Sequence, residues 1–196
     1  MRRESKPKSN INLIDLMIEH NARCEKKEIN AKKMSIDDMI GNLGLFFVAG
    51  TDTSRSTSTS LLYCLGEHSE ARNSIFKDIK DNILDGDIES FIKNPTKSLD
   101  MDRAGVLDNF VNETMRLHGI SVNVLRRRCT KNHKLGDIKI RKGTNLIAPI
   151  CGLHYDEEYF KNPYKFDIDR FSPERIHEIP KKTFLPFFEG GRRCSG

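Results

Sequence analysis

The stretch from Ile36 to Gly66 contains no proline, and it constrains the fold more than any other part of the chain. Both of its ends are rich in apolar residues, whereas residues 49–60 in its middle are mostly serine, threonine and glycine. Such residues are poor helix formers, so a hydroxyl-rich loop is one interpretation of the middle. Because neither a proline nor a glycine pair ends the first apolar part, we favour one long buried helix, locally loosened at Gly50.

The remaining segments predict a mainly α fold with a small β-sheet portion. Apolar residues recur at helical spacing in three further stretches. The first begins at Ile11, the second runs from Ser69 to Leu84, and the third runs from Met101 to His118. Ser35 and Asp38 have the spacing of a capping box at the start of the long helix. Short extended pieces separated by turns predict strands at 122–125, 135–140 and 146–150. Prolines after Cys151 predict a loop-like remainder.

The composition is that of a polar, soluble chain, and it argues against several classes of protein. Hydrophobic residues make up 37% and charged residues 31% of the 196, and a net charge of +5 does not by itself indicate nucleic-acid binding. The cysteines are odd in number and widely spaced, which argues against a disulfide scaffold or a zinc ribbon and for a reducing compartment. No apolar run approaches the ~20 residues of a membrane-spanning helix, and no signal peptide is present, so any membrane anchor is expected outside this chain.

One cysteine, Cys194, lies in a turn of glycines and arginines at residues 187–196. Glycines let the backbone take positive φ and approach a flat ligand, and arginines offer forked donors to carboxylates. The turn can therefore present a thiolate to a metal. The alternative is a basic RNA-binding segment, helped by Arg126–Arg128, but it lacks an aromatic stacking module and leaves the acidic residues unexplained.

Four motifs follow one another along the chain: Ala49-Gly50-Thr51-Asp52-Thr53-Ser54, Glu113-Thr114-Met115-Arg116, Phe166-Asp167-Ile168-Asp169-Arg170-Phe171 and the cysteine turn. In this order, and with these separations, the chain closely resembles the cytochrome P450 family, the haem-thiolate monooxygenases. The turn matches the family pattern F-x-x-G-x-R-x-C-x-G at every fixed position. Residues 1–10 are polar and are expected to be flexible, and the resemblance implies a single partial cytochrome P450 domain at residues 11–196.

The resemblance assigns the haem-binding residues. Cys194 would be the axial thiolate ligand of the iron, and thiolate donates electron density that favours O–O cleavage. Gly190 and Gly196 would let the turn approach the porphyrin, Phe187 would pack beside the haem or the cysteine, and Arg192 would pair with a haem propionate. A second propionate arginine is expected within Arg126–Arg128, where Arg127 is favoured and its neighbours stay open.

Two further sets of residues take roles from the resemblance. Asp52 and Thr53 would deliver protons at a water-poor site, and Gly50 would let oxygen or the haem edge approach the helix. A pair such as Glu113 and Arg116, three residues apart on a helix, is usually a surface salt bridge worth under ~1 kcal/mol. The resemblance instead places both, with Arg170, in a buried ionic cluster that locks the haem-binding core.

The activity implied by the resemblance is the insertion of one oxygen atom from O2 into an apolar small-molecule substrate. The implied cofactor is haem b, with electrons from NAD(P)H delivered by a P450 reductase, cytochrome b5 being an optional second donor. No nucleic-acid partner is expected, and the expected location is the cytosolic face of the endoplasmic reticulum membrane. The alternatives are a haem-thiolate isomerase or dehydratase, against which Asp52 and Thr53 argue, and a non-catalytic chain of the same family.

The sequence departs from the family pattern at Ser195, Phe188 and Ile168, where an apolar residue, a glycine or serine, and a proline are usual. None of these changes removes a reacting group. The chain is expected to be a C-terminal-half fragment, without the helix that follows the cysteine in the family. Because the dipole of such a helix lowers the pKa of a thiol, the chain by itself is expected to be inactive and to bind haem weakly or not at all.

Overall fold

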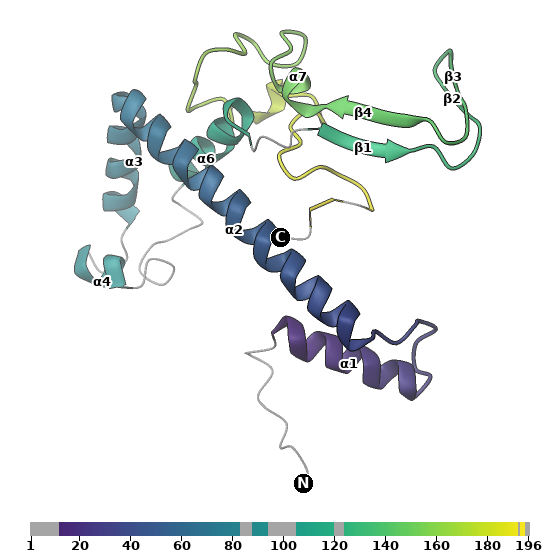
Figure 1. The fold of residues 1–196 in the computed structure, drawn as a ribbon. Coiled ribbons are helices and arrows are strands. Elements are labelled where there is room, and N and C mark those ends of the chain that lie inside the picture. Colours follow the sequence, from purple (N-terminus) through teal and green to yellow (C-terminus); the bar gives the residue numbers. More distant parts are fainter. Residues whose placement is uncertain (1–11, 83–87, 94–104, 120–123, 192, 195–196) are drawn as a thin grey trace. The chain divides into compact units, whose positions relative to one another are not determined.

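The computed structural model describes residues 12–82, 88–93, 105–119, 124–191 and 193–194 (Figure 1). The chain divides into two compact units, Met1–Ser54 and Arg55–Gly196, and each is described by itself. The helices are α1 (Leu13–Glu25), α2 (Ile36–Glu67), α3 (Ser69–Asn82), α4 (Ile88–Lys93), α6 (Gly105–Leu117) and α7 (Ile150–His154). The predicted mainly α fold class is confirmed. The predicted flexible segment 1–10 lies outside the described residues.

Side-chain hydrogen bonds cap the starts of α1 and α2, both of which begin in the first unit. The predicted capping box at the start of α2 is confirmed, because the Asp38 amide donates to Ser35 Oγ at 3.0 Å and the Ser35 amide donates to Asp38 Oδ2 at 2.9 Å. Asn12 and Asp15 form a second capping box at the start of α1. Asn21 of α1 accepts from the Met34 amide at 2.8 Å and donates to the Met34 carbonyl at 3.0 Å, which ties the connector to α1.

Helix α2 runs without a break through Gly50 and the hydroxyl-rich middle, as the favoured interpretation predicted. Threonine side chains donate to the carbonyls four residues earlier, including Thr51 to Phe47 at 2.7 Å and Thr59 to Arg55 at 2.9 Å. The hydroxyls are thereby satisfied inside the helix rather than competing with it.

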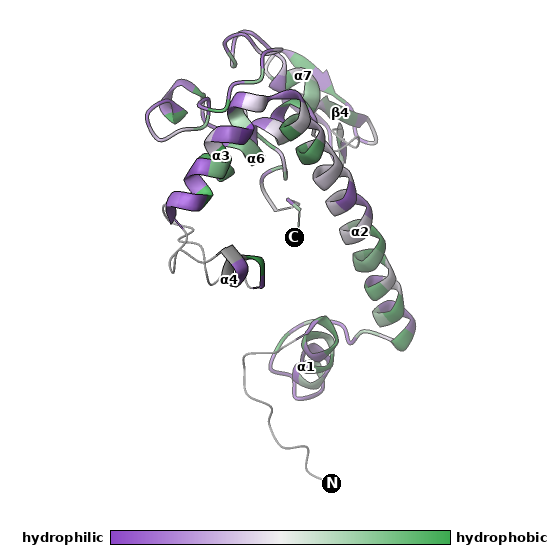
Figure 2. Cartoon of the chain, turned by 90° about the vertical axis from the view of Figure 1, so that its left-hand side faces the viewer, coloured by the Kyte–Doolittle hydropathy of each residue, from purple (hydrophilic) through white to green (hydrophobic). Residues whose placement is uncertain are grey.

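The prediction that this long helix is buried is wrong for most of its length in the described structure. Phe47 is 75% exposed and Leu62 is 69% exposed, and Cys64 is the buried residue that α2 contributes. Figure 2 shows hydrophobic colouring along the N-terminal half of the helix. The reason is that apolar residues surround α2 on more than one side, whereas its packing in the second unit involves a strip at Leu61, Cys64 and Leu65.

The core of the second unit lies where α3 packs against α6. Its buried residues are Cys64, Ala71, Ile75 and Phe110. Phe166 and Ile168 from the third sequence motif pack against this cluster, so the isoleucine that stands where the family has proline adds a partly buried apolar contact to the core. Asp78 of α3 accepts from the Val106 amide at 3.2 Å and so caps the start of α6.

The strands form two separate antiparallel pairs among the described residues, rather than the single small sheet that the sequence predicted. β1 (Val124–Arg128) pairs with β4 (Asn145–Pro149), and β2 (His133–Leu135) pairs with β3 (Ile138–Ile140). The second pair is a tight hairpin whose turn uses Gly136 at φ +56°. The remainder after Ile150 is loop-like as predicted, except for α7 and the short 3-10 helix η2 (Ile176–Glu178).

Within the described ranges, none of the helices combines the length and the apolar character needed to cross a bilayer.

Candidate functional site

The structure brings Glu113, Arg116 and Arg170 together into a buried ionic cluster. Glu113 is 0% exposed, and its two carboxylate oxygens accept from Arg116 Nε and Nη2, each at 2.8 Å. Arg170 Nε donates to both oxygens at 3.1 Å, although it lies far along the chain from α6. The Asp167 amide adds a further donor to Oε1 at 3.0 Å. The carboxylate thus has donors on both oxygens, which is the condition for keeping a buried charge in place.

Arg116 also holds the backbone that surrounds the cluster. Its Nη1 donates to the carbonyls of His154 at 2.9 Å and Pro163 at 2.7 Å, and Nη2 reaches the Lys165 carbonyl at 3.4 Å. Arg170 Nη1 donates to the Lys161 carbonyl at 2.8 Å. The end of α7 and the loop at residues 161–165 are therefore held by the two guanidinium groups of the cluster, whose rigid fork suits several acceptors at once.

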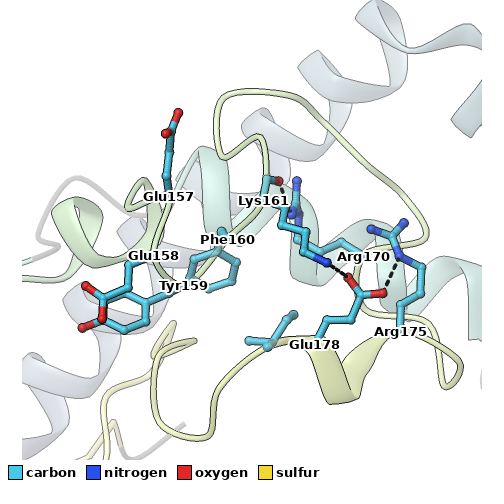
Figure 3. Close-up of a pocket in the computed structure, with 9 residues that line it drawn as sticks. Glu157, Glu158, Tyr159, Phe160, Lys161, Arg170, Arg175 and Glu178 are labelled. Carbon is cyan, nitrogen blue, oxygen red and sulfur yellow. Dashed lines mark hydrogen bonds and ion pairs between the residues drawn. The ribbon is translucent and has the colours of Figure 1, made fainter.

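A second carboxylate, that of Glu178, lies between two cations at the surface beside this cluster. A small pocket of about 80 Å³ includes Glu178 together with Lys161 and Arg175 in its lining (Figure 3). Glu178 lies 3.4 Å from Lys161 Nζ and 3.7 Å from Arg175 Nε, and all three side chains are partly or largely exposed. Exposed pairs of this kind contribute little to stability.

His154 is a functional candidate that the sequence reasoning missed. The side chain is 1% exposed, its Nε2 accepts from the Leu185 amide at 3.0 Å, and its ring lies against Phe160 and Phe184. Burial lowers the pKa of His154 to about 4. The only signal in the sequence was its position at the start of the family-like segment 154–166.

The pKa of His154 predicts a pH dependence of stability. In the unfolded chain a histidine has a pKa near 6.5, so between about pH 6.5 and 4 the unfolded state binds more protons than the folded state. The contribution of neutral His154 to the free energy of unfolding is therefore fully present above pH 6.5. The free energy of unfolding falls by about 3 kcal/mol as the pH drops to 4. Urea unfolding followed by circular dichroism across this range measures the loss. His154→Phe should flatten this part of the profile and His177→Phe, at an exposed position, should not; equal slopes in both variants contradict the assignment.

The cysteine turn is closed by backbone hydrogen bonds. The Cys194 amide donates to the Phe187 carbonyl at 2.9 Å, and the Arg193 amide donates to the Gly190 carbonyl at 3.2 Å. Gly190 has φ +87°, the conformation for which glycine was expected here. Phe188 has φ +60°, which explains why glycine suits this position in the family pattern. Cys194 and Phe187 are exposed, and Arg192 and Gly196 lie outside the described residues.

The three consecutive arginines lie on β1, where they pair with Asn145, Leu146 and Ile147 of β4. All three are exposed, and neighbours along a strand point to opposite faces, so Arg127 lies on the other face from Arg126 and Arg128. Arg127 Nη1 donates to the Arg126 carbonyl at 2.8 Å. The choice of the propionate arginine stays a prediction.

The predicted proton-delivery residues lie on α2 in the first unit. Thr53 is half-buried and its hydroxyl donates to the Ala49 carbonyl at 2.6 Å, whereas Asp52 is exposed. A Cβ placed on Gly50 would meet no described atom within 4 Å, so packing among the described residues does not require glycine there.

A single thiol donor at Cys194 fits a metal whose other ligands are supplied by a cofactor. Among the described residues, no three histidine, cysteine, aspartate or glutamate side chains are grouped to hold a metal ion. Cys194 supplies one exposed sulfur on a glycine-containing turn. A porphyrin supplies the equatorial ligands of its iron, so a single protein thiolate is sufficient for it.

Comparison with known proteins extends over the whole chain. The family model described as cytochrome P450 matches residues 1–196. Cytochrome P450 3A2 of Rattus norvegicus is 33% identical over 196 residues, which is 100% of this chain and 37% of that protein. Cytochrome P450 6j1 of Blattella germanica is 33% identical over 88% of this chain and 33% of that protein. Cytochrome P450 6a9 of Drosophila melanogaster is 32% identical over 94% of this chain and 35% of that protein.

The chain thus spans about a third of the length of these relatives. The matched region includes the long helix, the buried Glu113 cluster and the turn that presents Cys194. With a family model that covers every residue and relatives that align over nearly all of it, the chain belongs to the cytochrome P450 family.

Proposed function

We propose that the protein to which this chain contributes is a haem-thiolate monooxygenase that inserts one oxygen atom from O2 into an apolar organic substrate. The observation that carries the proposal is the exposed Cys194 on a glycine turn in a chain of this family. Electrons would come from NAD(P)H through a reductase, with cytochrome b5 as an optional second donor. The proposed location, by likeness to the relatives, is the endoplasmic reticulum membrane.

The residues of the second unit would hold the haem. A thiolate-bound haem supplies the activation of dioxygen, and the protein tunes it through its ligand and surroundings. Cys194 Sγ would bind the iron, Phe187 would pack beside the ring, and Gly190 and Gly196 would keep the turn close to it. Arg192 and one of the three β1 arginines, with Arg127 favoured, would neutralise the propionates.

The residues of the first unit would handle protons. The Thr53 hydroxyl uses its own proton in the bond to the Ala49 carbonyl, so its oxygen can accept a hydrogen bond from a water or a protonated group. Asp52, on the next residue of the helix, would pass protons from solvent to that position. Gly50 has no side chain and no described atom within 4 Å of a Cβ placed there, so it would leave room for the reactants.

The proposed reaction predicts the origin of the oxygen in the product. The complete product of the gene is supplied with haem, a P450 reductase and NADPH under isotopically labelled dioxygen, and a panel of apolar substrates is analysed by mass spectrometry. We expect one labelled oxygen atom per product molecule and none without NADPH. Rearrangement of an organic peroxide in the absence of NADPH and dioxygen, with no labelled product, would instead identify an isomerase or dehydratase.

A further inference from the structure

His154 contacts two parts of the second unit, the buried cluster around Glu113 and the segment that precedes the cysteine turn. On one side, its backbone carbonyl accepts from Arg116 Nη1 at 2.9 Å, and Arg116 belongs to the buried cluster with Glu113. On the other side, its imidazole Nε2 accepts from the Leu185 amide at 3.0 Å. The backbone and the side chain of one buried residue therefore face different partners.

The contact at Leu185 leads into the cysteine turn through the backbone. The Leu185 carbonyl accepts from the Phe188 amide at 3.2 Å, and the neighbouring Phe187 carbonyl accepts from the Cys194 amide at 2.9 Å. Phe184, just before Leu185, lies against the His154 ring with centroids 5.5 Å apart. The segment that precedes Cys194 is thus anchored on His154 at two adjacent residues.

The imidazole has one arrangement that satisfies this geometry. Because Nε2 accepts a hydrogen bond, the proton of the neutral ring is on Nδ1, which has no hydrogen-bond partner in the part of the chain that the structure describes. Phe160 lies edge-on to the ring at 6.0 Å, and Arg116, Glu113 and Arg170 are the charged groups of the cluster beside it. A protonated ring would lose its acceptor and place a cation beside the arginines.

We propose that His154 is a positioning residue, which couples the Glu113–Arg116–Arg170 cluster to the turn that presents Cys194. The importance of this position for haem binding rests on the proposed function, whereas the coupling itself concerns the chain without haem. Neutral His154 holds the segment from Phe184 to Phe188 in place beside the cluster. The Phe187 carbonyl in this segment accepts the hydrogen bond from the Cys194 amide.

Hydrogen exchange of single backbone amides, followed by nuclear magnetic resonance on the haem-free chain, tests the coupling. His154→Phe keeps a ring of similar shape and the backbone carbonyl that Arg116 uses, but it removes the acceptor for Leu185. We expect the Leu185, Phe188 and Cys194 amides to exchange about fivefold faster or more, the factor of one net hydrogen bond. The Asp167 amide, which donates to Glu113, should be unchanged and is the internal control.

His154→Gln is the matched variant, because its side-chain oxygen can take the place of Nε2 as the acceptor. Protection restored at Leu185 and Cys194 by glutamine supports the coupling, also where His154→Phe loosens the whole unit. Unchanged exchange at Leu185 and Cys194 in His154→Phe overturns it, as does equal loss of protection in both variants. Since no haem is present, a failure of the haem proposal leaves this result unaffected, and the reverse also holds.

Discussion

Replacing Glu113 with alanine is expected to destabilise the chain by about 3–5 kcal/mol and to abolish haem incorporation through misfolding. The carboxylate is 0% exposed and accepts from two guanidinium groups that are themselves buried. Alanine would leave both positive charges without a counter-charge, and the Asp167 amide would lose its acceptor as well. Urea unfolding followed by circular dichroism measures the loss of stability of the chain, and the haem absorption spectrum of the complete gene product with the same substitution measures incorporation.

Glu178→Ala is the matched control for this prediction, because it also removes a carboxylate from between two cations. Its partners are partly or largely exposed, so the expected loss is under about 1 kcal/mol. The contrast separates burial from the mere number of ion pairs. A Glu113→Ala chain as stable as Glu178→Ala, or one with a normal haem spectrum, contradicts the structural role of the cluster.

Replacing Cys194 with serine in the complete gene product is expected to abolish the thiolate-type Soret band of the reduced carbon-monoxide complex. A serine hydroxyl is nearly isosteric with the thiol, but it contains no sulfur and stays protonated. It therefore cannot replace the thiolate as a ligand of the iron. The backbone hydrogen bonds that close the turn, from the Cys194 amide to the Phe187 carbonyl and from the Arg193 amide to the Gly190 carbonyl, do not involve the replaced atom and should persist. The carbon-monoxide difference spectrum of the purified protein measures the effect.

Cys151→Ser is the control, because this cysteine is also exposed but lies on α7 outside the turn. Its spectrum should equal that of the unmodified protein. A loss in both variants would indicate a general sensitivity to cysteine replacement and not an iron ligand at Cys194.

Local features of the fold could be predicted where one sequence signal dominates. The absence of proline from Ile36 to Gly66 and the Ser35–Asp38 capping box predicted α2 correctly. Helix propensity alone left the hydroxyl-rich middle undecided, because it does not include the bonds from threonine hydroxyls to carbonyls one turn earlier. The exposure of α2 could not be predicted, since an apolar residue does not reveal which surface will cover it.

Contacts between distant residues needed either the resemblance or the structure. Helical spacing predicts that Glu113 and Arg116 share a face, but Arg170 joined them only through the family pattern. His154 was missed because its bond to Leu185 links residues 31 positions apart, with no periodic signal. The glycines of the Cys194 turn predicted a backbone with positive φ, and Gly190 has this conformation.

The proposed role of Cys194 as the thiolate ligand of a haem iron is tested by the carbon-monoxide difference spectrum during a haem titration. The complete gene product and its Cys194→Ser variant are titrated side by side under reducing conditions. We predict a thiolate-type Soret band that grows with added haem in the unmodified protein and is absent from the variant. Identical spectra for the two proteins at every haem concentration would contradict the claim.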